Sequence, residues 1–107
     1  MLIPGSTEYL YIVRSQFAEP TLENAWNEWY TGIHIPEMLS VPGIVTATRY
    51  RELAVQHQYV AMYEIEDLTV FSHDRYLEIA GWHDWLPYLS NWTKSIVKRV
   101  AGEKHYA

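Results

Sequence analysis

The sequence contains no cysteine, and this absence excludes several kinds of protein. The chain can form no disulfide framework, no thiolate nucleophile and no zinc site with thiolate ligands. It also has no apolar run near the ~20 residues of a membrane-spanning helix, and its N-terminus lacks the basic start and apolar core of a secretory signal. The chain is therefore expected to be cytoplasmic, with no membrane partner.

Basic residues are few, since 8 Lys and Arg stand against 13 Asp and Glu and give a formal net charge of −5. Such a chain is not expected to bind nucleic acid, because binding to phosphates depends on clustered cations. The sequence also has no HxH, no HExxH, no glycine-rich phosphate loop and no GxSxG elbow. These motifs mark metal, phosphate and serine-nucleophile sites, so no metal and no cofactor is expected.

Aromatic side chains are abundant: the 107 residues include 5 Trp and 9 Tyr, and 49% of the residues are hydrophobic. This composition is ample for one core, so residues 1–107 are expected to form a single domain with its core at about residues 8–100. Some of these aromatic groups are expected to line a ligand cavity or an interface between subunits.

The stretch from Trp26 to Tyr50 is predicted to be a helix followed by a strand. Pro36 has no amide hydrogen and crowds the carbonyl of Gly32, so the backbone around His34 is expected to kink or loosen. Spacings of three and four residues place a set of side chains on one side of the helix. That set is Trp26, Trp29, Tyr30, Ile33 and His34.

The other elements follow from alternation and periodicity along the chain. Strands are predicted at about 8–17, 44–53, 58–65 and 92–100, and helices at about 21–39 and 67–81. The aromatic segment 82–92 is expected to cover a cavity or another subunit. The order βαββαβ predicts a ferredoxin-like α+β fold, which is a four-stranded antiparallel sheet with both helices on one face.

The second face of this sheet is also predicted to be apolar. Alternation places Leu10, Ile12, Val60 and Met62 on it. An apolar face needs a cover, and a second copy of the sheet is the simplest one. The sequence therefore predicts a homodimer in which two sheets pack face to face into an α+β barrel.

The layout WxxWYxxxHIPExLxVPGIxxAxRY at Trp26–Tyr50 resembles the dimeric α+β barrel superfamily, in particular its EthD-like members. The resemblance extends over about residues 8–100 and implies a ligand cleft between the sheet and its own helices. The superfamily contains isomerases, cyclases, cofactor-free monooxygenases and haem-degrading enzymes, so the resemblance does not select one reaction.

Individual positions can be compared with the functional residues of that superfamily. Polyketide-cyclising members use a histidine on strand three and another just after helix two, and these positions here hold Tyr59 and His83. Haem-degrading and quinone-forming members use an Asn on strand one, a Trp on strand three and a His on helix two. Of these three, only the last has a counterpart here, His73.

His34 is the main candidate for catalysis. A neutral imidazole in an apolar cleft has a lowered pKa and can act as a general base near neutral pH. Tyr30, one turn earlier, is expected to donate a hydrogen bond to a substrate oxygen, and Glu37 to orient the ring. His83 is expected to be a second acid/base group or part of the cavity lining. The alternative interpretation is structural, with His34 bonded to a carbonyl that Pro36 leaves free.

A phenol-rich pocket is predicted to bind the substrate. Its expected residues are Tyr9, Tyr11, Tyr59, Tyr63, Trp26 and Trp82. Such a pocket suits an aromatic or polyketide-like molecule, although an ordinary aromatic core explains the same pattern.

The sequence thus predicts a small cofactor-independent enzyme that acts on a hydrophobic small molecule with a carbonyl, lactone or phenol group. Isomerisation, cyclisation or elimination requires only proton transfer and exclusion of water. Three alternatives remain open: a cofactor-free monooxygenase of aromatic or polyketide compounds, a non-catalytic ligand-binding accessory protein of a catabolic pathway, and haem binding through a histidine.

Overall fold

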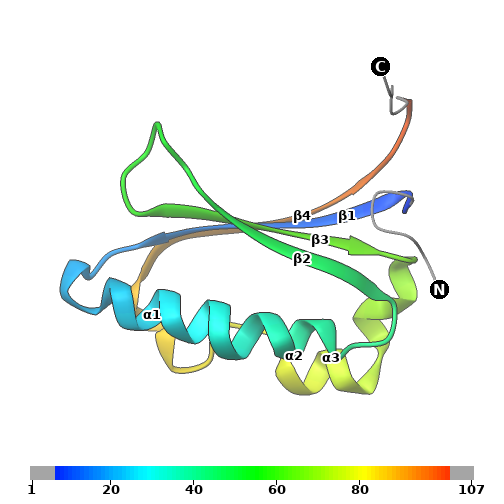
Figure 1. The fold of residues 1–107 in the computed structure, drawn as a ribbon, viewed down its shortest axis with the longest axis horizontal. Coiled ribbons are helices and arrows are strands. Elements are labelled where there is room, and N and C mark those ends of the chain that lie inside the picture. Colours follow the sequence, from blue (N-terminus) through cyan, green and yellow to red (C-terminus); the bar gives the residue numbers. More distant parts are fainter. Residues whose placement is uncertain (1–6, 102–107) are drawn as a thin grey trace.

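A four-stranded antiparallel sheet with helices on one of its faces makes up the fold (Figure 1). The structure is a computed structural model that describes residues 7–101, so residues 1–6 and 102–107 lie outside the described part. The main elements are β1 (Tyr9–Phe17), α1 (Glu23–Trp29), α2 (Ile35–Leu39), β2 (Ile44–Arg51), β3 (Gln58–Ile65), α3 (Asp74–Ile79) and β4 (Leu89–Lys98). The strand order is β2-β3-β1-β4, which confirms the predicted ferredoxin-like α+β fold.

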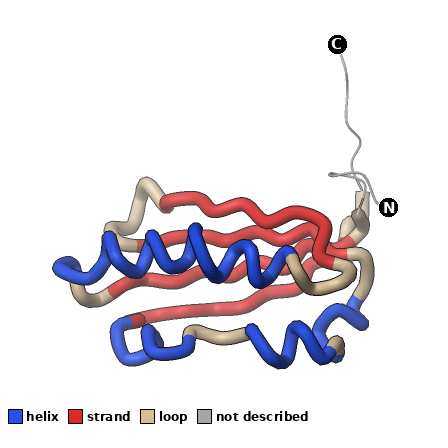
Figure 2. Tube along the Cα trace, turned by 60° about the horizontal axis from the view of Figure 1, so that its bottom comes forward, coloured by secondary structure: helices blue, strands red, loops and turns tan. Residues whose placement is uncertain are grey.

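Short helical segments connect the longer elements. They are the 3₁₀ helices η1 (Pro20–Leu22), η3 (Leu68–Ser72) and η4 (His83–Tyr88), and the π-helical turn η2 (Tyr30–His34). Figure 2 shows α1 and α2 as one continuous rod in front of the strands, with α3 and η4 in a second row beside it. No helix within residues 7–101 is long and apolar enough to span a bilayer.

The core lies between this helical layer and the inner face of the sheet. Strand register forms rows across that face: Tyr11 is opposite both Tyr63 and Ile96, and Val13 is opposite both Ala61 and Lys94. The register also places Tyr9, Tyr11, Tyr59 and Tyr63, all expected pocket residues, on this one face.

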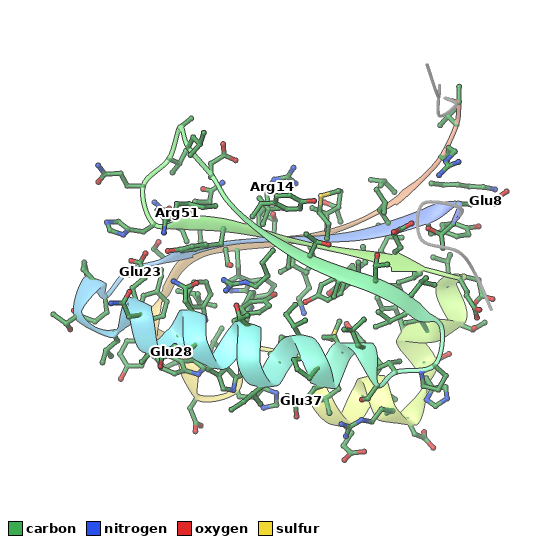
Figure 3. All side chains as sticks on the ribbon, in the orientation of Figure 1. Glu8, Arg14, Glu23, Glu28, Glu37 and Arg51 are labelled. Atoms are coloured by element: carbon green, nitrogen blue, oxygen red, sulfur yellow. The ribbon has the colours of Figure 1, made fainter. Side chains whose placement is uncertain are left out.

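The opposite face of the sheet has no cover within residues 7–101 (Figure 1). The predicted apolar residues of this face are Leu10, Ile12, Val60 and Met62, and all are only half-buried. Arg14 also projects from it, away from the helices (Figure 3). The face that was expected to pack against a second copy is thus open in the single chain.

The predicted irregularity before Pro36 takes the form of a π turn. The Ile35 N–H donates to the carbonyl of Tyr30, five residues earlier, in place of the usual partner four residues back. Pro36 has no N–H to give to Gly32, so the regular ladder is broken at the next position as well. The helix continues in α2 without a stop.

This wider turn changes which side chains face the sheet. Of the residues predicted to share one side of the helix, Trp26, Tyr30 and His34 are buried, but Ile33 is 53% exposed. The prediction for Ile33 is therefore wrong. A π turn holds more residues than an α turn, so spacings that share a face in a regular helix diverge across it.

Boundaries elsewhere differ from the prediction at three places. The helix expected at 67–81 is split into η3 and α3 by His73, whose extended backbone (ψ 136°) lets its ring accept a hydrogen bond from the Arg75 N–H. β2 ends at Arg51 rather than at 53, because the Glu52 N–H donates to the carbonyl of Gln58 and closes the loop between β2 and β3. β4 begins at Leu89 rather than at 92, because η4 occupies only residues 83–88 of the aromatic segment.

Candidate active-site cavity

A narrow cavity, partly open to solvent, lies between the inner face of the sheet and the helices, with about 20 Å³ of free space for a water-sized molecule. Strands, both rows of helices and the loop after α3 all contribute to its lining. The lining residues are Tyr11, Val13, Tyr30, His34, Met38, Tyr63, Tyr76, Ala80, Gly81, Trp82 and Lys94.

Paired phenols form much of this lining. The Tyr30 and Tyr63 hydroxyls lie 3.3 Å apart, and the Tyr11 and Tyr76 hydroxyls lie 3.4 Å apart. The rings of Tyr11 and Tyr63 stack with centroids 5.7 Å apart, which joins the two pairs. Burial raises the pKa of Tyr11, Tyr30 and Tyr63 above the ordinary value of 10.0. These phenols therefore keep their protons at neutral pH and serve as hydrogen-bond donors rather than as bases.

His34 supplies an imidazole to the same cavity, and its side chain is only 6% exposed. The ring stacks on Trp29 with centroids 5.0 Å apart. Burial, followed by the nearby charges of His83, Lys94 and Arg49, lowers the pKa of His34 to about 4. The ring is therefore neutral near pH 7.

The structural interpretation of His34 required a hydrogen bond to a backbone carbonyl. Within residues 7–101 the Nδ1 atom of His34 is buried and has no hydrogen-bond partner. It lies 3.7 Å from the Oε1 atom of Glu37, beyond hydrogen-bond distance. The structure thus gives no support to a role of His34 in bonding a freed carbonyl.

His83 lies beside His34 but does not line the cavity. The centroids of the two rings are 6.2 Å apart. The Nε2 atom of His83 is 3.0 Å from the carbonyl oxygen of Ile79, and since a carbonyl only accepts, Nε2 carries the proton. His83, His34 and Glu37 each place one potential metal-ligand atom within 4.8 Å of the others.

The remaining predicted pocket residues are divided between the cavity and other parts of the core. Tyr11, Tyr63 and Trp82 line the cavity together with Tyr30. Trp26 is fully buried and packs on Phe17, and it does not reach the cavity.

Two of the predicted tyrosines lie elsewhere on the sheet. Tyr59 is on β3, and its side chain contacts the start of α1. Its hydroxyl donates to the carboxylate of Glu23 and accepts a hydrogen bond from Asn27. Tyr9 packs against the edge of the core and has the Lys98 ammonium 5.7 Å from its ring centroid. Neither residue lines the cavity.

Two cations near the cavity were missed by sequence reasoning. Lys94 and Arg49 lie at opposite ends of one row across the sheet, with Val13 and Ala61 between them. Burial lowers the pKa of Lys94, which lines the cavity directly. Alternation along the last strand places Lys94 on the inner face, but only the strand register places it beside His34.

Arg49 lies behind the cavity lining rather than in it. Its guanidinium carbon is 4.1 Å from the ring centroid of Tyr30 and 5.3 Å from that of Trp26, and Nη1 donates to the Thr31 hydroxyl. A cation held over these rings is stabilised by their π-electron density. It also places positive charge behind the phenol of Tyr30.

Comparison with known proteins supports the fold and goes no further. No family model and no curated protein sequence matches the chain. A dimeric ferredoxin-like protein from an uncultured marine organism is similar with a TM-score of 0.73 at 10% identity, over 94% of this chain and 95% of that one.

Two similar structures are oxygenases by name. SnoaB, a cofactor-independent oxygenase from Streptomyces nogalater, has a TM-score of 0.61 at 19% identity, over 91% of this chain and 97% of its own. An antibiotic biosynthesis monooxygenase has a TM-score of 0.65 at 10% identity, over 86% of this chain and 99% of its own. At these identities the similarity shows a shared ferredoxin-like fold alone.

Proposed function

We propose that this protein is a cofactor-independent enzyme that removes a proton from a hydrophobic phenol, lactone or enolisable carbonyl compound bound in the cavity. One observation carries the proposal: a neutral, buried imidazole lines a cavity that it shares with phenol donors and an amine. An acceptor for the proton and donors for the developing oxyanion are thus present in one apolar site.

Each group has a role in this reaction. His34 accepts the proton from the substrate carbon or hydroxyl and returns it at another position, which completes an isomerisation or a cyclisation. The hydroxyl of Tyr30 or Tyr63 donates to the substrate oxygen, and the ammonium of Lys94 stabilises its negative charge. The apolar lining from Val13 and Met38 excludes water and strengthens these interactions.

The second candidate is a cofactor-free monooxygenase, which is favoured by the structural similarity to SnoaB and to an antibiotic biosynthesis monooxygenase. Its first step is the same deprotonation, after which the electron-rich anion is oxidised by O₂, with one oxygen atom entering the product and the other leaving as water. Oxygen uptake distinguishes the two, because isomerisation consumes none. A relationship to EthD-like members, which we also propose, agrees with either reaction.

We also propose that the protein acts as a homodimer. The open apolar face of the sheet calls for a cover, and a second copy offers a matching apolar surface. The similar protein from the marine organism is described as dimeric, which agrees with this arrangement.

Proton transfer can be tested before the substrate is known. The protein is incubated in D₂O with a panel of phenols, lactones and 1,3-dicarbonyl compounds, and deuterium incorporation is followed by NMR. We expect exchange above the buffer rate for at least one class, and a loss of at least about tenfold in His34→Gln. His73→Gln is the matched control, since His73 is exposed and is not among the residues that line the cavity.

The opposite outcome has a definite meaning. Binding of a panel compound without exchange or oxygen uptake would support the accessory-protein alternative. Exchange that persists unchanged in a folded His34→Gln protein would remove His34 from the mechanism.

A further inference from the structure

We propose that His34, Glu37 and His83 form a binding site for one divalent transition-metal ion such as Zn²⁺ or Co²⁺. Their potential ligand atoms all lie within 4.8 Å of one another. His34 and Glu37 are one turn apart on the continuous helix formed by α1, η2 and α2, and His83 is the first residue of η4. This site goes beyond the proposed function, because it lies beside the cavity and can be measured without any substrate.

His34 provides the first indication of a ligand here. Its side chain is 6% exposed, and its Nδ1 atom is buried with no hydrogen-bond partner within residues 7–101. A buried polar atom without a partner is costly, so it calls for an explanation. A cation between Nδ1 and the Glu37 carboxylate would satisfy both groups.

The spacing of these two groups suits a metal better than it suits a direct contact. Zinc binds nitrogen and carboxylate oxygen at about 2.1 Å, which places tetrahedral ligand atoms about 3.4 Å from one another. The Nδ1 to Oε1 distance of 3.7 Å is too long for a hydrogen bond and close to this value.

The tautomer of His83 leaves one ring nitrogen able to bind a metal ion. Its Nε2–H donates to the carbonyl of Ile79 at 3.0 Å, so its Nδ1 keeps a free lone pair. Ligating histidines commonly give their other N–H to a backbone carbonyl, which fixes the tautomer and the ring orientation. The backbone of His83 is in the left-handed region (φ 54°), which is uncommon for any residue except glycine. Such conformations cluster at functional sites.

Trp29 holds both rings in place. It stacks on His34 with an interplanar angle of 14° and meets His83 nearly edge-on, with centroids 5.9 Å apart. The two imidazoles are therefore ordered by packing before any ion arrives, which lowers the entropic cost of binding.

Solvent can reach the proposed site, and its donor atoms favour certain ions. Glu37 is 31% exposed at its side chain and His83 is exposed, so an ion can enter from solvent. Figure 3 shows Glu37 projecting from the side of the helix that faces away from the sheet. Two imidazoles and one carboxylate suit Zn²⁺, Co²⁺ or Ni²⁺, whereas Mg²⁺ prefers oxygen ligands alone.

The test uses the full chain without a histidine tag, freed of metal with EDTA. Calorimetric titration with ZnCl₂ is expected to give one Zn²⁺ per chain with a dissociation constant below about 100 µM, and titration with MgCl₂ to give no binding. Glu37→Gln and His83→Ala should each weaken Zn²⁺ binding at least about tenfold. Visible absorption of bound Co²⁺ should disappear in both variants.

Matched controls separate this site from adventitious binding. Glu28→Gln removes an exposed carboxylate from the same helix, and His73→Ala removes an exposed imidazole, so both should bind Zn²⁺ like the parent chain. Absence of Zn²⁺ binding to the parent would overturn the proposal, as would equal affinity in Glu37→Gln, His83→Ala and the controls. Because Glu37 and His83 are accessible, these variants remain informative even if a His34 variant does not fold.

Discussion

The Nδ1 atom of His34 and the Oε1 atom of Glu37 lie 3.7 Å apart across one turn of the long helix. At this distance the buried nitrogen has no hydrogen bond, although the Glu37 carboxylate is its neighbour. The same imidazole also lines the cavity. If both proposals hold, base catalysis and metal binding at His34 are coupled.

The first prediction concerns that coupling. A ring that binds Zn²⁺ through Nδ1 keeps its proton on Nε2, so it can no longer accept a proton from the substrate. Zn²⁺ should therefore inhibit deuterium exchange by the parent chain. Glu37→Gln should retain exchange and lose most of the sensitivity to Zn²⁺, as measured by NMR over a zinc titration. Equal inhibition of both proteins would show that zinc acts elsewhere.

The second prediction concerns the phenol pair of Tyr30 and Tyr63, whose hydroxyls are 3.3 Å apart in the core. Tyr63→Phe leaves the Tyr30 hydroxyl buried without this partner, which should lower the free energy of unfolding by about 1–2 kcal/mol. The double variant, with Tyr30→Phe and Tyr63→Phe, should lower the free energy of unfolding little more than either single variant, because both polar groups are then removed. Urea denaturation measures all three, and strictly additive losses would contradict a direct interaction.

The third prediction compares two glycines. Gly43 has φ of +96°, and a Cβ there would lie 2.6 Å from the Val70 side chain. Gly43→Ala should therefore destabilise the protein by more than about 1 kcal/mol. Gly32 lies in the helix with nothing within 4 Å of an added Cβ, so Gly32→Ala should stabilise it by about 0.5–1 kcal/mol. Thermal melting of both variants tests the opposite signs.

The fourth prediction concerns the proposed dimer. Ile12 and Met62 are opposite each other on the open face of the sheet. A charge at Ile12→Asp should convert the dimer to a monomer, because it would be buried without a partner between two sheets. Leu77→Asp, at a 63% exposed position on α3, is the control and should leave the mass in light scattering unchanged. A monomeric parent chain would refute the dimer directly.

Much of the fold could be predicted because local pattern and tertiary structure agree. The alternation in Gln58–Ile65 matches β3 residue for residue, and Pro36 indicated the irregular turn that holds His34. Boundaries were less well predicted where bulky residues tolerate several conformations, as at the start of β4. There the pairing with β1 decided that the strand begins at Leu89.

The candidate site was only partly predictable, for a geometric reason. The spacing of Tyr30 and His34 along one helix placed them together, since helical neighbours are fixed by sequence. Tyr59 and Tyr63 share a strand face, yet they lie two rows apart, and only Tyr63 lines the cavity. Sequence alternation shows which side chains share a face of the strand. It does not show which of them lies next to the cavity between the sheet and the helices.

The sequence by itself therefore determined the order of the elements, the apolar faces and the candidate imidazole, because these depend on periodicity along the chain. Only the tertiary structure decided that Lys94 shares the cavity and that His83 stands beside His34 and Glu37. Those contacts join residues far apart in sequence. Strand register and the packing of η4 on Trp29 set them, and no local pattern encodes either one.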